Sequence, residues 1–375
     1  MATQASCTAP PEVESAPALS SSIKAVPPRH KKKLVRRVEK DRSAIYRRSF
    51  QGAFLLLNLW IGGRFYAWVR HFELGLGPSE VARPAGVEGW LPIAGLMNLK
   101  YWLLSGQIPL VHPAAMFLLL TFLAMSFVFR KAFCSWLCPI GTISEYLWQA
   151  GKQVFGRNFS LPRWIDLPLR GLKYFLLGFF VWAISTMSVA GIRDFMTSPY
   201  GLVADVKMLN FFRHIGETGL VVLGVIVAAS VFVPNLWCRF LCPYGALLGL
   251  TAWLSPMKIR RNPEPCIDCG KCAKACPSSL PVDKLITIKS AECTGCLECV
   301  AVCPAEGALQ ISLPRWTRLA NEGRIPAWAI AVAIAVLFLG IVGFAKSAGY
   351  WNGDVPDYVY RQLVPQADDI NHPGE

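Results

Sequence analysis

The chain has 375 residues, of which 53% are hydrophobic and only 17% are charged, and its mean hydropathy is +0.38. This composition excludes an ordinary soluble domain and indicates an integral membrane protein. The formal net charge of +14 includes a basic stretch at 29–48, directly before the first apolar segment, where it acts as a topology signal. No nucleic-acid recognition motif accompanies this charge, so we expect membrane lipid, and not nucleic acid, as a partner.

Hydropathy divides the chain into five parts. Residues 1–48 form a basic segment that we expect to be disordered. Residues 49–256 form a transmembrane domain with four spans and an interfacial segment at 89–104. Residues 257–313 form a cysteine-rich domain, 314–346 contain a fifth span, and 347–375 form a tail. The spans are expected at 50–69, 113–129, 172–190, 219–236 and 327–345.

The short basic segments predict the orientation of these spans. They precede the first span, separate the second from the third, and flank the cysteine-rich domain on both sides. The positive-inside rule then places the N-terminus and the cysteine-rich domain in the cytoplasm and the tail in the periplasm. We therefore expect a multi-pass protein of the cytoplasmic (inner) membrane.

Two matching motifs come after the second and the fourth span. Cys134 and Cys138 precede Pro139, and Cys238 and Cys242 precede Pro243, so that C-x3-C-P recurs 104 positions further along. The constant offset predicts a parallel internal repeat. Spacing i, i+4 would put both thiols of a pair on one helix face. We interpret the four cysteines as candidates for an additional metal centre or for redox dithiols, because soft thiolates suit iron, an iron–sulfur cluster or Cu(I); buried cysteines that only pack are the alternative.

The cysteine-rich domain contains two runs of C-x2-C-x2-C-x3-C-P. This spacing is typical of bacterial proteins with two 4Fe–4S clusters, in which the fourth cysteine of each run ligates the other cluster. Zinc or disulfides explain the doubled order less well. We assign the first cluster to Cys266, Cys269, Cys272 and Cys303, and the second to Cys293, Cys296, Cys299 and Cys276. The predicted fold class is thus an α-helical polytopic membrane protein, with about five transmembrane helices and an inserted small α+β double-cluster ferredoxin-like domain.

These motifs together resemble the membrane polyferredoxin family, which includes proteins of the NapH, NosR and CcoG types. The resemblance covers about residues 45–312 and all twelve motif cysteines. It implies electron transfer between the quinol pool, or a cytoplasmic donor, and a respiratory or maturation partner protein. The chain lacks the long flavin-binding domain of the NosR type and has too short a tail for the CcoG type, so we expect the layout of the NapH type.

A quinol site would need a proton acceptor near the lipid interface. His112 and His214 lie near the outer ends of predicted spans and are the candidates for such a site. No catalytic residue is assigned, although a role as a quinol dehydrogenase subunit would fit. The alternatives are a copper reductase or assembly factor, which would use the C-x3-C-P thiols, and a redox sensor or scaffold without catalysis.

Overall fold

The computed structural model describes residues 35–37, 41–76, 82–156, 159, 161–313 and 325–373. Most of the expected disordered segment 1–48 therefore lies outside the described residues. Its last residues differ from the expectation, because helix α1 (Ser43–Glu73) already includes 43–48. Val35 and Arg37 form backbone hydrogen bonds with Glu306 and Pro304, next to the second cysteine run. The basic segment thus ends against the cysteine-rich domain.

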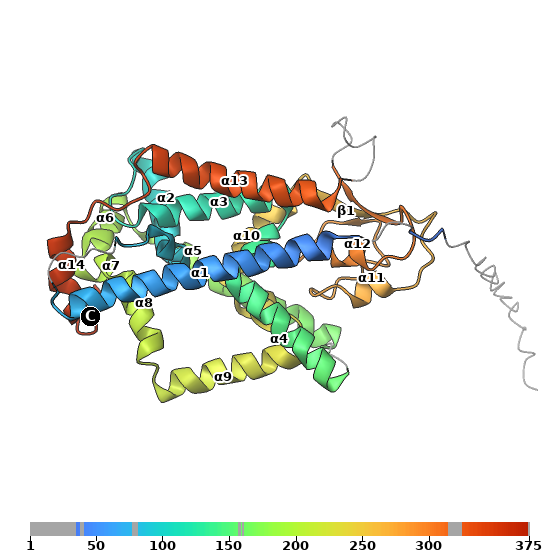
Figure 1. The fold of residues 1–375 in the computed structure, drawn as a ribbon, viewed down its shortest axis with the longest axis horizontal. Coiled ribbons are helices and arrows are strands. Elements are labelled where there is room, and N and C mark those ends of the chain that lie inside the picture. The colour runs from blue at the N-terminus through green and yellow to red at the C-terminus, as the bar shows by residue number, and fades with distance from the viewer. Residues whose placement is uncertain are drawn as a thin grey trace, which may run out of the picture.

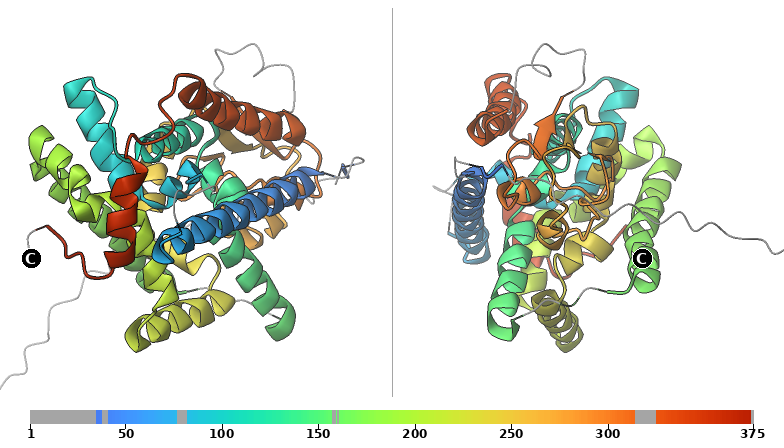
Figure 2. Two further views of the ribbon diagram at one scale, coloured as in Figure 1. Left: turned by 60° about the vertical axis from the view of Figure 1, so that its left-hand side comes forward. Right: turned by 90° about the vertical axis from the view of Figure 1, so that its right-hand side faces the viewer.

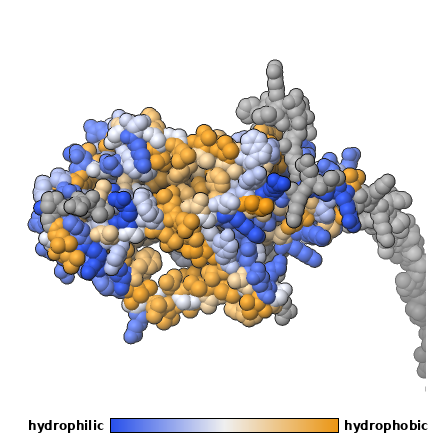
Figure 3. Space-filling view, viewed as in Figure 1, coloured by the Kyte–Doolittle hydropathy of each residue, from blue (hydrophilic) through white to orange (hydrophobic). Residues whose placement is uncertain are grey.

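Long helices cross a central apolar band, and polar residues gather at both ends of the molecule (Figures 1 and 3). Among the described residues, Trp164–Thr186 of α5 (Arg163–Thr186) and all of α13 (Ala327–Ser347) are long and apolar enough to span a membrane. The pair α8 (Ala204–Arg213) and α9 (Glu217–Phe232), bent by 82°, is a third candidate. The apolar helix α3 (Pro113–Phe129) has only 17 residues. Two or three spans are therefore supported, and the count of five stays a prediction.

The predicted repeat exists as two equivalent units. One consists of α3, the π-helical turn η2 (Phe133–Leu137) and α4 (Pro139–Phe155), and the other of α9, η3 (Trp237–Leu241) and α10 (Pro243–Trp253). The units exchange their second helices, because α10 packs on α3 while α4 packs on α9. In the same way η2 packs on α1 and η3 packs on α5. This reciprocal packing brings the two π-helical turns together in the middle of the bundle.

Short helices form the end of the molecule opposite the cysteine-rich domain (Figures 1 and 2). The expected interfacial segment 89–104 is a 3-10 turn, η1, followed by α2, which begins at Pro92 and stops where Gly106 takes a left-handed conformation. Helix α2 packs on α3 and α6. The elements of this end are η1 (Ala85–Trp90), α2 (Pro92–Ser105), α6 (Val189–Thr197), α7 (Pro199–Leu202), α8, α14 (Asp357–Leu363) and η5 (Val364–Gln366).

The cysteine-rich domain contains a three-stranded antiparallel sheet with strand order β2-β1-β3. Ile259 pairs with Ile288 on one side and with Ile311 on the other, and all three side chains are buried. The two cysteine runs pass beside this apolar sheet, each with a single helical turn. The elements are β1 (Lys258–Arg261), α11 (Lys271–Lys274), β2 (Thr287–Ile288), α12 (Glu298–Ala301) and β3 (Leu309–Ser312).

Candidate metal centres

The two cysteine runs have the same loop conformation. Asp268 and Gly270 in the first run, and Gly295 and Leu297 in the second, occupy equivalent positions, and all four have positive φ. Left-handed residues within such loops turn successive backbone N–H groups toward one point, a geometry that recurs at iron–sulfur sites. Each run therefore forms a loop whose backbone N–H groups can point toward a bound group, and the two loops have the same shape.

Each loop closes a small cavity with a cysteine from the other run. One cavity is lined by Cys266, Cys269, Cys272 and Cys303, and the other by Cys276, Cys293, Cys296 and Cys299. These are the two sets of four predicted from the spacing. Burial raises the pKa of Cys272 to about 11 and that of Cys296 to about 12. Thiolates at these positions therefore require a cation, and soft iron ligated by four sulfurs meets this requirement.

The two cavities differ in their surroundings. The cavity of Cys266 lies near the surface, where Cys269 is exposed and Arg261 Nη1 lies 3.5 Å from Cys266 Sγ. The second cavity is also lined by Ile259 and Ile288 of the sheet and by Leu280 and Val282. A centre in the second cavity would thus lie inside the domain, and one in the first would lie toward solvent.

The C-x3-C-P motifs have a geometry that differs from the single helix face expected. Cys134 lies in a π-helical turn, whereas Cys138 is extended and caps α4 by accepting a hydrogen bond from Gly141 N at 3.4 Å. Cys242 accepts the equivalent bond from Gly245 N at 3.2 Å. Pro139 therefore begins a new helix. A Cβ atom at Gly141 would lie 2.3 Å from the Cys134 carbonyl oxygen, so this tight turn requires glycine. Such π-helical turns are frequent at functional sites.

All four motif cysteines line one large cavity of about 990 Å³. The repeat thus brings Cys134 and Cys138 to the same space as Cys238 and Cys242. The walls are mostly apolar and come from α1, α3 and α13. The walls also include polar and charged residues. The principal lining residues are Phe54, Asn58, Trp60, Arg64, Arg83, Trp90, Phe122, Tyr244, Phe338, Val342, Lys346 and Trp351. No motif in the sequence indicates this cavity, because its walls come from segments far apart in the chain.

A second, small chamber lies on the other side of the motifs. It is lined by Cys134 and Cys238 from the two repeats and by Cys296 of the inner ferredoxin-type cavity. The three groups of cysteines therefore succeed one another from the membrane helices outward: the four motif cysteines, then the set with Cys296, then the set with the exposed Cys269.

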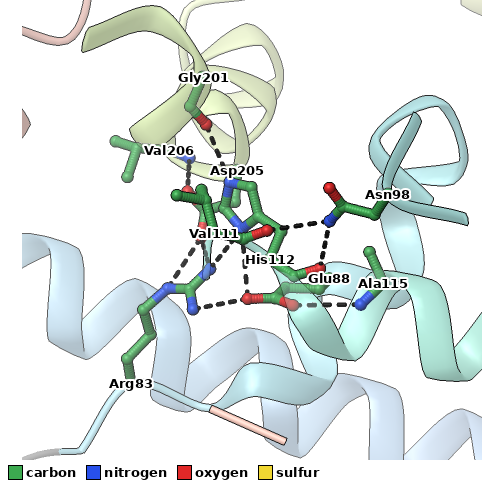
Figure 4. Close-up of polar contacts among 9 residues, drawn as sticks. All are labelled: Arg83, Glu88, Asn98, Val111, His112, Ala115, Gly201, Asp205 and Val206. Atoms are coloured by element: carbon green, nitrogen blue, oxygen red, sulfur yellow. Dashed lines mark hydrogen bonds and ion pairs between the residues drawn. The ribbon is translucent and has the colours of Figure 1, made fainter. Parts of the chain in front are cut away.

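The two candidate histidines lie apart and neither lines the large cavity. His214 is exposed, with Nδ1 3.7 Å from Asp368 Oδ2. His112 is buried in a network with Arg83, Glu88 and Asp205 (Figure 4). Its Nε2 lies 2.9 Å from the Gly201 carbonyl oxygen, to which it donates, and its Nδ1 lies 3.2 Å from both Arg83 Nη2 and Glu88 Oε1. Arg83 also binds Asp205 Oδ2 at 2.6 Å and lines the cavity.

Comparison with known proteins agrees with these sites. Residues 111–162 and 215–262 match the model of a "4Fe-4S binding domain", and residues 258–310 match a "4Fe-4S dicluster domain". The chain is 50% identical over 327 residues to YccM of Escherichia coli, by its name a candidate electron transport protein, which covers 87% of this chain and 92% of that protein. The chain belongs to the membrane polyferredoxin family. It is an iron–sulfur electron-transfer protein.

More distant relatives of this polyferredoxin include a protein that is named as ferredoxin-type. The ferredoxin-type protein NapH of Escherichia coli is 24% identical over 70% of this chain and 87% of its own length. Protein NirI of Paracoccus denitrificans is 29% identical over 68% of this chain and 38% of its own length. The expected NapH-like layout is thus confirmed. No solved structure matches the chain.

The stability of the His112 network is expected to depend on pH. Burial pulls the pKa of His112 down, but the hydrogen bond to Glu88 and the charges of Glu88 and Asp205 raise it above 6.5 overall. The positive charge of protonated His112 stabilises the folded protein, because it offsets the charges of Glu88 and Asp205, whose other cationic partner is Arg83. This stability is therefore fully present below pH 6.5 and is lost as the pH rises through the higher folded-state pKa.

We expect His112→Gln to lower stability by about 3–5 kcal/mol at pH 6, because a buried ion network loses one partner. In the unchanged protein we expect the melting temperature to fall as the pH rises above 6.5, and in the variant we expect no such fall. The measurement is the melting temperature in detergent between pH 5.5 and 9. The exposed His214→Gln is the control and should behave like the unchanged protein; the same pH profile for His112→Gln and the unchanged protein would contradict the prediction.

Proposed function

We propose that this protein oxidises a membrane quinol in the large cavity and delivers the electrons, through its ferredoxin-like domain, to a redox partner protein. The observation that carries this proposal is the meeting of the cavity with four cysteines from both repeats. A quinol that becomes a quinone releases two electrons and two protons. The cysteines form one part of the cavity wall, and Arg83, Lys346 and Asn352 provide polar groups at other parts of it.

The cavity has the size and lining of a site for a small apolar ring compound. Its volume of about 990 Å³ lies at the upper end of ordinary ligand pockets, whose walls are apolar with a few placed polar groups. Trp60, Phe122 and Phe338 supply flat apolar surfaces, while Asn58 and Arg64 are within the same wall and can bind quinol oxygens. His112 lies behind Arg83 and so would act through it and not on the ring.

We infer that three groups of cysteines hold metal. Cys266, Cys269, Cys272 and Cys303 would hold one 4Fe–4S cluster, and Cys276, Cys293, Cys296 and Cys299 a second. The four C-x3-C-P cysteines would together hold a third thiolate-bound centre, which agrees with the two "4Fe-4S binding domain" matches that span them. When bound, such centres supply one-electron carriers. The protein residues hold them in a series from the cavity to the exposed Cys269.

We also propose five spans in the inner membrane, with the ferredoxin-like domain in the cytoplasm and the tail in the periplasm. Helix α1 would then be the first span, α3 the second, α5 the third, α9 the fourth and α13 the fifth. The basic segments support this orientation. The position of α14 at the end of the molecule opposite α11 and α12 agrees with it (Figure 1).

The cavity is tested by filling it. Val342 on α13 lines the cavity, whereas Val336 on the same helix is 65% exposed and does not line it. We expect Val342→Trp to slow quinol-dependent reduction of the iron–sulfur centres at least tenfold, because the indole occupies the space of the ring. Stopped-flow absorbance would monitor the reduction. Val336→Trp should behave like the unchanged protein, and dithionite should reduce all three preparations. An unchanged rate in Val342→Trp would exclude this cavity as the quinol site.

The motif cysteines are tested by Cys138→Ser and Cys242→Ser. Serine is nearly isosteric but is a poor ligand for soft metals. We expect these variants to keep roughly eight iron and eight sulfide atoms per chain in the ferredoxin-like domain, as two clusters require, but to lose quinol-dependent reduction. Metal and sulfide analysis accompanies the kinetics, and copper in place of additional iron would favour a copper-handling role. A variant with serine at all four motif cysteines is the strictest test. If quinol still reduced its iron–sulfur centres at the full rate, the motif cysteines would have only a packing role.

Orientation is tested with reporter fusions. An alkaline phosphatase fused after Glu375 should be active, because the tail is expected in the periplasm, while a fusion after Pro314 should be inactive. A fluorescent protein that matures only in the cytoplasm should give the opposite pattern at the two sites. The same compartment for both fusions would mean that α13 does not cross the membrane.

A further inference from the structure

The chamber between the repeats and the ferredoxin-like domain has an unusual distribution of charge. It has a volume of about 20 Å³, room for about one water molecule, so its lining residues face one another closely. Cys134, Cys238 and Cys296 form part of its wall. Any electron that moves between the motif cysteines and the ferredoxin-like domain would cross here. The charges around the chamber therefore bear directly on that step.

The two carboxylates of the chamber are each bound by their own cation. Glu292 accepts hydrogen bonds from Lys173 Nζ at 2.6 Å and from Tyr174 Oη at 3.1 Å. Glu145 accepts hydrogen bonds from Arg47 and Gln51. Each carboxylate thus already has a bound cation, and Glu292 also lies close enough to Lys131 for the two charges to interact.

The cations of the chamber are not all paired in this way. Arg239 binds Asp166, which it shares with Arg170. Lys131 is only 2% exposed, and within the described residues its Nζ makes no hydrogen bond and no ion pair. Lys131 is therefore a buried cation next to Cys134 that forms no hydrogen bond with an anion and shares the charge of Glu292 with Lys173.

Arg130, the residue before Lys131, is in a similar position. Its side chain is fully buried, and its Nη2 donates to the Ser290 carbonyl oxygen, at the start of the second cysteine run. Its Nε and Nη1 have no hydrogen-bond partner among the described residues. Arg130 and Lys131 are thus two adjacent buried cations, and neither forms a hydrogen bond with a carboxylate among the described residues. Lys131 lines the chamber, and Arg130 lies against the loop of the second cysteine run.

The turn itself does not need these charges. In the second repeat the equivalent positions are Pro234 and Asn235, and the chain still enters η3 and places Cys238 and Cys242 at the cavity. Lys131 shares Glu292 with Lys173, and Arg130 binds no carboxylate among the described residues, so this region holds more buried cations than carboxylates. Burying such an excess of positive charge is costly unless a further anion offsets it. A metal centre held by four thiolates is such an anion.

We propose that Arg130 and Lys131 are positioning residues that balance the negative charge of the thiolate-bound centres on either side of the chamber and raise their reduction potentials. This rests on the proposed iron–sulfur centres but not on quinol as the donor. Net charge is one of the factors that set the potential of an iron–sulfur cluster. Reduction adds an electron, so a nearby fixed cation stabilises the reduced form more than the oxidised form.

The test is a redox titration of the full-length protein in detergent with dithionite, monitored by electron paramagnetic resonance. Lys131→Met should shift one component to lower potential, with about a tenfold smaller ratio of reduced to oxidised centre at a fixed potential, which is 59 mV for a one-electron couple. Lys131→Arg keeps the charge and should titrate like the unchanged protein. Lys274→Met removes an exposed lysine of α11 and should leave the potential of that component the same as in the unchanged protein.

Iron and sulfide analysis shows whether each variant has assembled its centres. If Lys131→Met does not, Arg130→Gln provides the same measurement at the other cation. Unchanged potentials in the assembled variants would overturn the proposal, as would an equal shift in Lys131→Arg, which would indicate side-chain shape in place of charge. Because dithionite is the reductant, a protein that quinol fails to reduce can still give the expected shift, so the two proposals fail separately.

Discussion

The junction at Arg47 fixes the ferredoxin-like domain to the membrane helices. This residue of α1 is fully buried and binds Glu145 of α4 and Glu298 of α12, so one guanidinium joins three elements. One turn further, Gln51 donates to the Ser135 carbonyl oxygen, inside the first motif. Removing one partner from such a buried set leaves an uncompensated charge and is strongly destabilising. This set of contacts fixes the position of Cys134 relative to Cys296. A fixed separation matters because electron transfer needs centres that stay close together.

The cysteine chemistry could be read from the sequence because it is local. Three ligands of each predicted set lie within seven residues, and the spacing also predicts the crossing fourth ligand. In the structure Cys303 lines a cavity with Cys266, and Cys276 lines one with Cys293. The repeat was also readable, since Cys134 and Cys238 share an offset with their prolines. Features that arise from packing could not be read in this way. The π-helical turn of the first repeat depends on Gly141 fitting against a carbonyl group. The cavity is enclosed by residues from segments far apart in the chain, among them Val342 of α13 and Trp60 of α1.

The two repeats share a shape but not a chemistry. Their helices exchange partners symmetrically, yet only the first repeat has cations before its motif, and only the second has Tyr244 after it, where the first has Ile140. His112 likewise has no counterpart at the outer end of the second unit, where Gly216 precedes α9. A symmetric scaffold thus supports an asymmetric site, with the ferredoxin-like domain on one side and the cavity on the other. The cysteines are common to both repeats, whereas the charged and aromatic residues around them differ.

The exposure of Cys269 has a consequence for the protein in air. A cluster held by this cysteine would meet dissolved oxygen before the one behind Ile259 and Ile288, whose cavity is closed by apolar side chains. Oxidative damage would therefore begin at the outermost centre, while the centre behind the apolar side chains remained intact. Loss of one exposed cluster would then interrupt electron transfer through the protein although its other centres were still assembled.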